Sequence, residues 1–121
     1  MQGAEIACGI IRGRILEGKD MTINAVRRGQ RVIVRLGGEL DHHSAEEIRL
    51  ALDHILTDFT VRELQLDMTN VTFMDSAGLG VVLGRYRTIS ARGGKLILSG
   101  VRTGIDRIFR MSGLYALVER N

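Results

Sequence analysis

The stretch from residue 63 to residue 99, ELQLDMTNVTFMDSAGLGVVLGRYRTISARGGKLILS, decides the fold because it holds two strand patterns separated by a helix. Leu64, Leu66 and Met68 alternate with polar residues, which is typical of a strand. The run KLILS is apolar enough for a strand buried on both faces. Residues 76–92 between them predict a helix that ends at a glycine pair. A strand, a helix and a strand in this order indicate a right-handed parallel crossover.

Residues before this stretch predict a hairpin and a helix. Residues 22–41 form two short strands around an Arg-Gly-Gln turn, and the second strand points Val32, Val34 and Leu36 inward. Residues 44–56 follow with apolar residues at helical spacing. Ser44 at its start and Glu47 three positions later have the spacing of a capping box, in which each side chain accepts from the other residue's free backbone N–H.

Residues after this stretch complete the pattern. Residues 103–113 predict a third helix that stops at Gly113, and a short final strand is expected near Leu117. The sequence therefore predicts an α/β domain, in which a mixed β-sheet with an antiparallel N-terminal edge hairpin is packed by helices.

The first 20 residues carry no strand or helix period that continues into this domain, and regular patterning begins just after Met21. Two interpretations of residues 1–20 stay open. They are a flexible extension of the domain, or a non-native segment that results from a wrongly assigned start site. The chain is 121 residues long and 45% hydrophobic, which fits one ordinary core. We expect a single domain at residues 21–121.

The composition disfavours several classes of protein. The chain has 17 Lys and Arg against 14 Asp and Glu, yet its arginines are scattered and only 4% of its residues are aromatic. Nucleic-acid binding needs clustered basic residues and stacking aromatics, so we expect no direct nucleic-acid contact. The lone Cys8 cannot form an internal disulfide, and no apolar run reaches the roughly 18 residues of a membrane span. These features predict a cytoplasmic protein without a membrane segment, and we expect a monomer when free.

The helix at residues 76–92 separates into two faces at about 100° per residue. The predicted core face holds Leu79, Val82, Leu83, Tyr86 and Ile89. The opposite face is small and nearly uncharged, with Ala77, Gly80, Val81, Gly84, Thr88 and Ala91, and has Arg85, Arg87 and Arg92 at its rim. A glycine in a helix interior costs roughly 1 kcal/mol, which the close approach of another backbone would offset. We interpret this face as a docking surface; the alternative is that another part of the same chain covers it.

Ser76 stands at the start of this helix, where unpaired N–H groups and the positive end of the helix dipole meet. One interpretation is an N-cap, in which Ser76 or Asp75 accepts from a backbone N–H two or three residues on. The other is a phosphate acceptor, because helix-terminal amides can hold a phosphate whose charge would alter the docking face without unfolding the domain. The two interpretations are compatible.

Three segments carry a further signal, namely GELDHHSAEEIR at 38–49, FMDSAGLGVVLGRY at 73–86 and RIFRMSGLY at 107–115. They resemble, in the same order, segments of the anti-sigma factor antagonists of the STAS domain family, over residues 21–119. The resemblance implies a STAS-like fold without a cofactor or catalytic residues of its own. It also implies a protein that binds a serine-kinase anti-sigma factor and thereby releases a sigma factor.

By the same resemblance, Ser76 corresponds to the serine that the kinase phosphorylates with ATP, which ends the interaction until a PP2C-type serine phosphatase restores it. The family also implies that the loop from Glu39 to His43 lies beside this serine. The expected partner-binding residues are Glu39, Asp41, His42, Asp75, Ala77, Gly80, Val81 and Gly84. Ala77 stands where the family often has a second hydroxyl residue, so Ser76 is the only hydroxyl at the junction.

Other chemistries fit the sequence less well. A serine hydrolase would need the Gly-x-Ser-x-Gly elbow, and Met74 stands where its first glycine would be. His42 and His43 are adjacent, which is poor spacing for a metal site, and the glycines of GLGVVLG do not match the dinucleotide fingerprint. The motifs DHH and MSGLY favour the sporulation branch of the family. The alternatives that remain are a general-stress or other partner-switching pathway and, from another class, an NTP-binding or NTP-hydrolysing enzyme.

Overall fold

The structure is a computed structural model that describes residues 5–7, 10–12, 14–17 and 21–121, with side chains from residue 21 onward. The predicted order of strands and helices is confirmed from residue 21 to the end. In chain order the elements are β1 (Glu5–Ala7), β2 (Ile10–Arg12), β3 (Arg14–Glu17), β4 (Met21–Arg28), β5 (Arg31–Leu40), α1 (Ala45–Ile55), β6 (Glu63–Met74), α2 (Ser76–Ala91), β7 (Lys95–Ser99), α3 (Thr103–Ser112), the 3₁₀ turn η1 (Leu114–Ala116) and β8 (Glu119–Arg120).

The main sheet is mixed, with the strand order β3-β4-β5-β6-β7-β8. Strands β4 and β5 form the predicted antiparallel hairpin, and β5, β6, β7 and β8 run parallel to one another. The sequence pattern did not predict strands before residue 21, yet β3 pairs antiparallel with β4 and extends the sheet beyond the hairpin. Strands of three or four residues give no measurable period. Of them, β3 is hydrogen-bonded to the longer strand β4, whereas β1 and β2 pair with each other in a separate two-stranded sheet. Cys8 lies outside the described residues.

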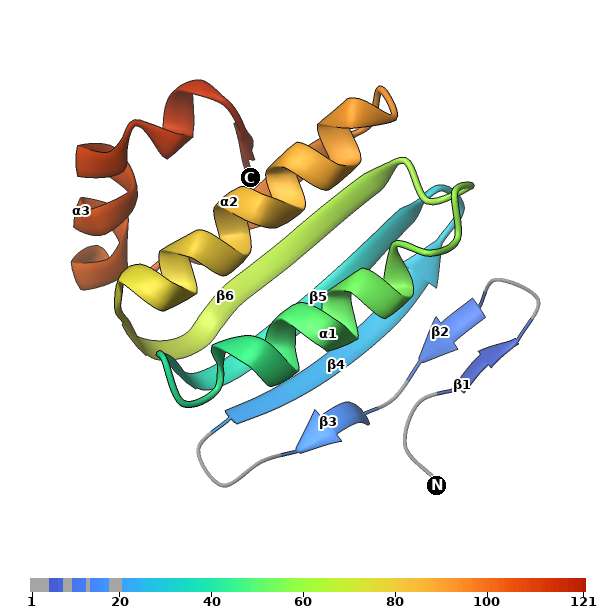
Figure 1. The fold of residues 1–121 in the computed structure, drawn as a ribbon, viewed down its shortest axis with the longest axis horizontal. Helices are drawn as coiled ribbons and strands as arrows, with labels where there is room; N and C mark the ends of the chain where they lie inside the picture. Colours follow the sequence, from blue (N-terminus) through green and yellow to red (C-terminus); the bar gives the residue numbers. More distant parts are fainter. Residues whose placement is uncertain (1–4, 8–9, 13, 18–20) are drawn as a thin grey trace.

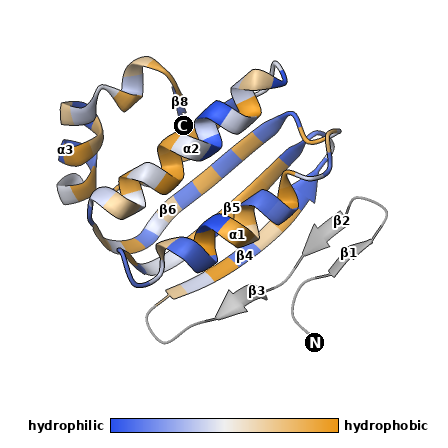
Figure 2. Cartoon of the chain, viewed as in Figure 1, coloured by the Kyte–Doolittle hydropathy of each residue, from blue (hydrophilic) through white to orange (hydrophobic). Residues whose placement is uncertain are grey.

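One hydrophobic core lies between the sheet and the helices. Figure 1 shows α1 and α2 lying across the same face of the sheet, with α3 at the end where β6 leads into α2. The inward residues predicted for β5 and β6 are buried, as are Ile105 and Phe109 of α3. The stripes of alternating hydropathy along β6 in Figure 2 follow from this arrangement, because neighbouring strand residues point to opposite faces of the sheet.

The opposite face of the sheet carries a ladder of polar side chains instead of a second core. Its cross-strand contacts are Arg31–Glu63 at 2.8 Å, Lys95–Glu119 at 3.0 Å, Gln65–Ser99 at 3.1 Å and Arg35–Asp67 at 3.4 Å. The central residue of β7, Ile97, is nevertheless buried on this face, and its neighbours Leu96 and Leu98 are buried in the hydrophobic core on the other face. The predicted burial of β7 on both faces is therefore confirmed.

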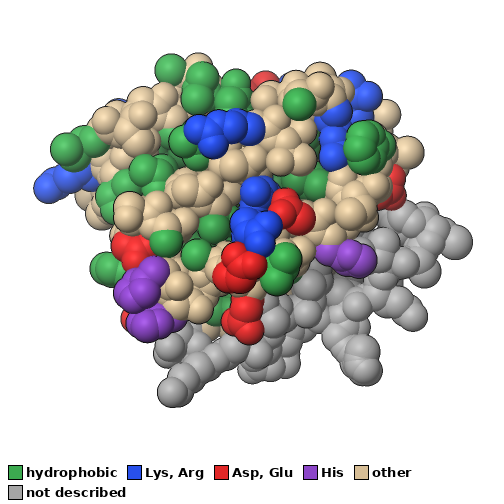
Figure 3. Space-filling view, viewed as in Figure 1, with side chains coloured by type: hydrophobic (Ala, Val, Ile, Leu, Met, Phe, Trp, Pro, Cys, Tyr) green, Lys and Arg blue, Asp and Glu red, His purple; other side chains and the backbone are tan. Residues whose placement is uncertain are grey.

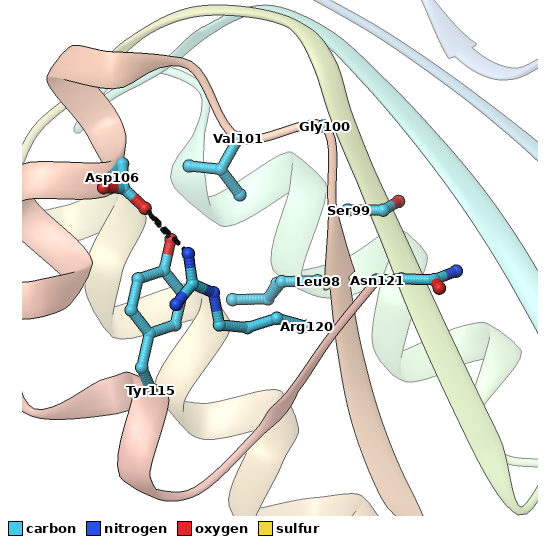
Figure 4. A pocket seen from close by; sticks show the side chains of 8 residues that line it. All are labelled: Leu98, Ser99, Gly100, Val101, Asp106, Tyr115, Arg120 and Asn121. Carbon is cyan, nitrogen blue, oxygen red and sulfur yellow. Dashed lines mark hydrogen bonds and ion pairs between the residues drawn. The ribbon is translucent and has the colours of Figure 1, made fainter.

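The C-terminal segment returns to the sheet through β8 and lines an open polar pocket of about 240 Å³ between β7, α3 and η1. In Figure 4 the side chains of Asp106, Tyr115 and Arg120 point toward one another across this pocket. The Tyr115 hydroxyl donates to Asp106 Oδ1 at 2.6 Å, and the Arg120 guanidinium lies 4.0 Å from the centre of the Tyr115 ring. Burial, together with the hydrogen bond to Asp106, raises the pKa of Tyr115 to about 12.

This contact gives the fold a dependence on alkaline pH. The folded state favours the neutral hydroxyl of Tyr115, so its stabilising effect is complete below the unfolded pKa of about 10 and is lost as pH rises through about 12. We expect Tyr115→Phe to flatten the dependence of the unfolding free energy on pH across this window, as measured by urea denaturation. Wild-type and Tyr115→Phe proteins with parallel profiles would contradict the assignment.

Candidate functional site

Asp75 caps helix α2 at the junction with β6. Its Oδ1 accepts hydrogen bonds from the backbone N–H groups of Ala77 at 2.9 Å and Gly78 at 3.1 Å. Ser76 is the first residue of the helix and is exposed. Of the two capping residues that the sequence allowed, the structure therefore selects Asp75. Since the cap does not use the Ser76 hydroxyl, that hydroxyl can react without loss of the cap.

The loop between β5 and α1 lies against this junction, as the family resemblance implied. The backbone N–H of His42 donates to Asp75 Oδ2 at 3.0 Å, and His42 Nδ1 lies 3.2 Å from the same oxygen. The Asp75 N–H in turn donates to the Leu40 carbonyl at 3.4 Å. Asp75 thus connects the loop to the start of α2 and places Asp41, His42 and Ser76 at one end of the molecule. An adjoining pair of histidine side chains marks this end in Figure 3.

The start of α1 differs from the capping box that the sequence predicted. Ser44 makes no side-chain cap to the helix. Its Oγ donates to the Glu39 carbonyl at 2.7 Å and accepts from the Asp41 N–H at 3.2 Å. Asp41 Oδ1 accepts from the N–H groups of His43 and Ser44. Ser44 and Asp41 therefore stabilise the loop beside Ser76 instead of closing the reciprocal bond to Glu47.

The hydrogen bonds at Asp75 set its charge. Partial burial of the carboxyl raises its pKa, but the bonds from the Gly78 N–H, the His42 side chain and N–H, and the Ala77 N–H outweigh burial and lower the pKa of Asp75 below its usual value. Asp75 is consequently ionised at neutral pH, directly beside the Ser76 hydroxyl. Any negative group added to Ser76 would meet this carboxylate.

Helix α2 buries a wider face than the sequence predicted. The predicted core face is confirmed, because Val82 and Ile89 are buried and Leu79, Leu83 and Tyr86 pack against the core. Its buried residues are Gly78, Val81, Val82, Arg85 and Ile89. Val81 is 6% exposed, so its prediction as an outward-facing, partner-binding residue is wrong. The reason is Arg85, which the sequence placed at the exposed rim because it is charged. In the structure it is 8% exposed, and its Nε lies 3.2 Å from Asp53 Oδ1 on α1.

The remaining docking residues lie where the sequence placed them. Ser76 and Gly80 are exposed, and Ala77 and Gly84 are partly exposed. A Cβ atom added to Gly80 or Gly84 would meet no described atom within 4 Å. Among the described residues, Gly80 and Gly84 are therefore open to a partner. The alternative that the chain itself covers this face holds only for its buried residue Val81. Exposed Glu39 completes the surface, because it pairs with Phe73 where β5 and β6 end beside the loop.

Gly78 is a residue of this site that the sequence analysis missed. A Cβ atom at Gly78 would collide with the Leu40 carbonyl oxygen and lie 2.9 Å from Leu40 Cγ and from Met74 Cγ. The start of α2 can therefore approach the end of β5 only because residue 78 lacks a side chain. Its position among three closely spaced glycines hid this role, because Gly80 and Gly84 are open and Gly78 is not.

A metal site and a membrane-spanning helix have specific requirements that the described residues do not meet. No group of three or more His, Cys, Asp and Glu that could hold a metal ion occurs in the described ranges. Among the described segments no helix has the length and apolar character needed to cross a bilayer.

Comparison with known proteins agrees with this arrangement. The family model described as the STAS domain matches residues 22–120. The chain belongs to the STAS domain family. The anti-sigma F factor antagonist of Paenibacillus polymyxa is 40% identical over 87 residues, which cover 72% of this chain and 74% of that protein. The anti-sigma-B factor antagonist of Listeria monocytogenes is 33% identical over 87 residues, covering 69% of this chain and 73% of that protein.

Solved structures include a STAS relative in a modified state. The Bacillus cell fate determinant SpoIIAA in its phosphorylated form superposes with a TM-score of 0.68 at 32% identity, covering 82% of this chain and 90% of that chain. These similarities place this STAS protein among the anti-sigma factor antagonists. The expected fold class is confirmed with them.

Proposed function

We propose that this chain binds a serine-kinase anti-sigma factor through the exposed surface around Ser76, and that phosphorylation of Ser76 ends the binding. The docking surface consists of Glu39, Asp41, His42, Asp75, Ala77, Gly80 and Gly84. The observation that supports the proposal is the arrangement at the first turn of α2. Asp75 caps the helix, and the adjoining Ser76 is left exposed. Occupation of the anti-sigma factor by this surface would release its sigma factor.

The proposed modification follows ordinary phosphoryl transfer. Ser76 Oγ attacks the γ-phosphorus of ATP on the kinase, the bond from that phosphorus to the bridging oxygen of ADP breaks, and the hydroxyl proton passes to a base of the kinase. The product carries nearly two negative charges next to the ionised Asp75. Because Asp75 already accepts from Ala77 and Gly78, the cap remains and only the docking surface changes. A PP2C-type serine phosphatase would reverse the step by hydrolysis.

The pathway is most consistent with the sporulation branch. Two relatives named for sigma F are 40% identical to this chain, whereas relatives named for sigma B are 33–34% identical. We propose that the chain is a regulatory module and a kinase substrate in the cytoplasm, monomeric when free and without a cofactor or catalysis of its own. A general-stress partner would use the same serine and surface.

Incubation with ATP and the serine-kinase anti-sigma factor of the same organism tests this function. We expect one phosphate per chain on the peptide that contains Ser76, as located by peptide mass. Ser76→Ala should abolish incorporation and keep kinase binding, because the cap at Asp75 does not use the Ser76 hydroxyl.

Ser90→Ala provides the matched control, because Ser90 lies on the same helix, where its Oγ donates to the Arg87 carbonyl. This variant should accept phosphate as the wild type does. Phosphate on another residue, or an unmodified wild type with a kinase shown to be active, would contradict the proposal. A titration of the chain alone with ATP and GTP separates it from the NTP-binding alternative, which requires saturable binding.

A further inference from the structure

An apolar groove opens beside the docking surface, between the end of β6 and the start of α3. It has a volume of about 490 Å³, and its lining includes Thr72, Phe73, Met74, Arg102, Ile105 and Ile108. Phe73 is 48% exposed, which is unusual for a phenylalanine next to a buried core. In Figure 3 hydrophobic side chains gather on the surface over α3 and the start of α2, at the same end as the adjoining pair of histidines.

The groove and the docking surface share a wall. Phe73 and Met74 line the groove, and the chain continues directly into the cap Asp75 and Ser76. In the sheet Phe73 pairs with Glu39 of the docking surface, and Met74 pairs with Leu40. Phe73 lies three residues before Ser76, so even an extended chain would separate their Cα atoms by no more than about 10–11 Å. A protein that brings its active site to Ser76 therefore passes within reach of the groove.

The charged side chain at the rim of the groove indicates what kind of partner side chain would bind there. Arg102 Nε donates to the Thr69 carbonyl at 3.0 Å, which holds this exposed guanidinium at the rim of the groove. The floor is formed by the apolar side chains of Met74, Ile105 and Ile108. An apolar side chain with a carboxylate close to it would match both features.

We infer that this groove receives an apolar side chain of the serine-kinase anti-sigma factor, and that an acidic residue beside that side chain pairs with Arg102. The inference rests on the proposed function and adds an anchor to it. A buried apolar anchor next to a phosphorylation site raises the affinity for the kinase without taking part in the chemical step. The groove should therefore determine the Kd and KM of the kinase for this substrate and leave kcat unchanged.

Two variants of the full chain test the groove in opposite ways. Phe73→Ser removes an apolar wall, whereas Gly104→Leu fills the groove, because a Cβ at Gly104 meets no described atom within 4 Å. Each should raise the Kd for the kinase and the KM for Ser76 phosphorylation by at least about tenfold, with kcat within about twofold of wild type. Met111→Ser is the control, since Met111 is an 82% exposed residue of α3 away from the groove lining.

The outcomes distinguish a failure of the groove proposal from a failure of the proposed function. If Phe73→Ser and Gly104→Leu retain wild-type Kd and KM while Ser76 is phosphorylated, the groove proposal is overturned and the proposed function stands. If wild-type Ser76 is not phosphorylated, the proposed function itself fails. A wild-type dimer that Phe73→Ser dissociates, without weaker kinase binding, would assign the groove to a second copy of this chain. Circular dichroism of both variants checks that neither loss comes from unfolding.

Discussion

Gly84→Arg is expected to weaken binding of the serine-kinase anti-sigma factor by at least about a hundredfold, or about 2.7 kcal/mol, while the domain stays folded. Gly84 lies one helical turn beyond Gly80 on the open side of α2, and the space in front of it is free of described atoms. An arginine side chain would fill the volume that a docked backbone needs. Because arginine forms helices better than glycine by up to about 1 kcal/mol, the unfolding free energy should hold or rise.

Isothermal titration with the kinase and urea denaturation measure the two effects separately. Ser90→Arg is the matched control, because Ser90 is also a partly exposed residue of α2 but lies outside the docking face, about 21 Å further along the helix than Ser76. It should bind the kinase as the wild type does. A loss of stability in Gly84→Arg as large as its loss of binding would show that this face is internal packing.

The sequence predicted the fold where burial on one side leaves a regular pattern. Val32, Val34 and Leu36 alternate with residues on the polar face, and the structure buries all three. Helix α1 was predicted for the same reason, since Ile48, Leu52 and Ile55 recur at helical spacing and are buried. Such patterns depend on neighbouring residues, so they can be read without knowledge of the tertiary structure.

The burial of Val81 and Arg85 on α2 could not be predicted in the same way. A charged side chain is expected at the surface, so the sequence placed Arg85 at the exposed rim and Val81 beside it. In the structure Arg85 is buried beside the Asp53 carboxylate of another helix. Burial lowers the pKa of Arg85 against the attraction of Asp53. A pair of charges that are distant in sequence leaves no local pattern, and Val81 was placed on the wrong face for this reason.

In the candidate site, too, the features set by neighbouring residues could be predicted, and those set by residues distant in sequence could not. Capping by Asp75 or Ser76 was predictable from their position before the helix, because a cap bonds N–H groups two or three residues on. The choice between them was not, because His42 also bonds Asp75 and fixes its orientation from a distant loop. The family resemblance placed this loop beside the serine, which spacing alone could not do.

Gly78→Ala and Gly80→Ala are expected to change stability in opposite directions, although they make the same substitution two residues apart on one helix. At Gly78 the new Cβ would collide with the Leu40 carbonyl and crowd the Met74 side chain. Overpacking of this kind costs about 1–3 kcal/mol, and we expect about 2 kcal/mol or more because the backbone carbonyl cannot rotate away. At Gly80 the space is open, so alanine should stabilise the helix by up to about 1 kcal/mol.

Urea denaturation of the two variants gives the comparison directly, and phosphorylation extends it to function. Relief of the collision at residue 78 must move α2 away from Leu40, which also shifts Asp75 from the His42 loop that bonds it. Gly78→Ala should therefore slow phosphorylation of Ser76 even under conditions where the protein is fully folded. Equal stability of the two variants would mean that the start of α2 adjusts freely, and that Ser76 is not held in a fixed place relative to the loop.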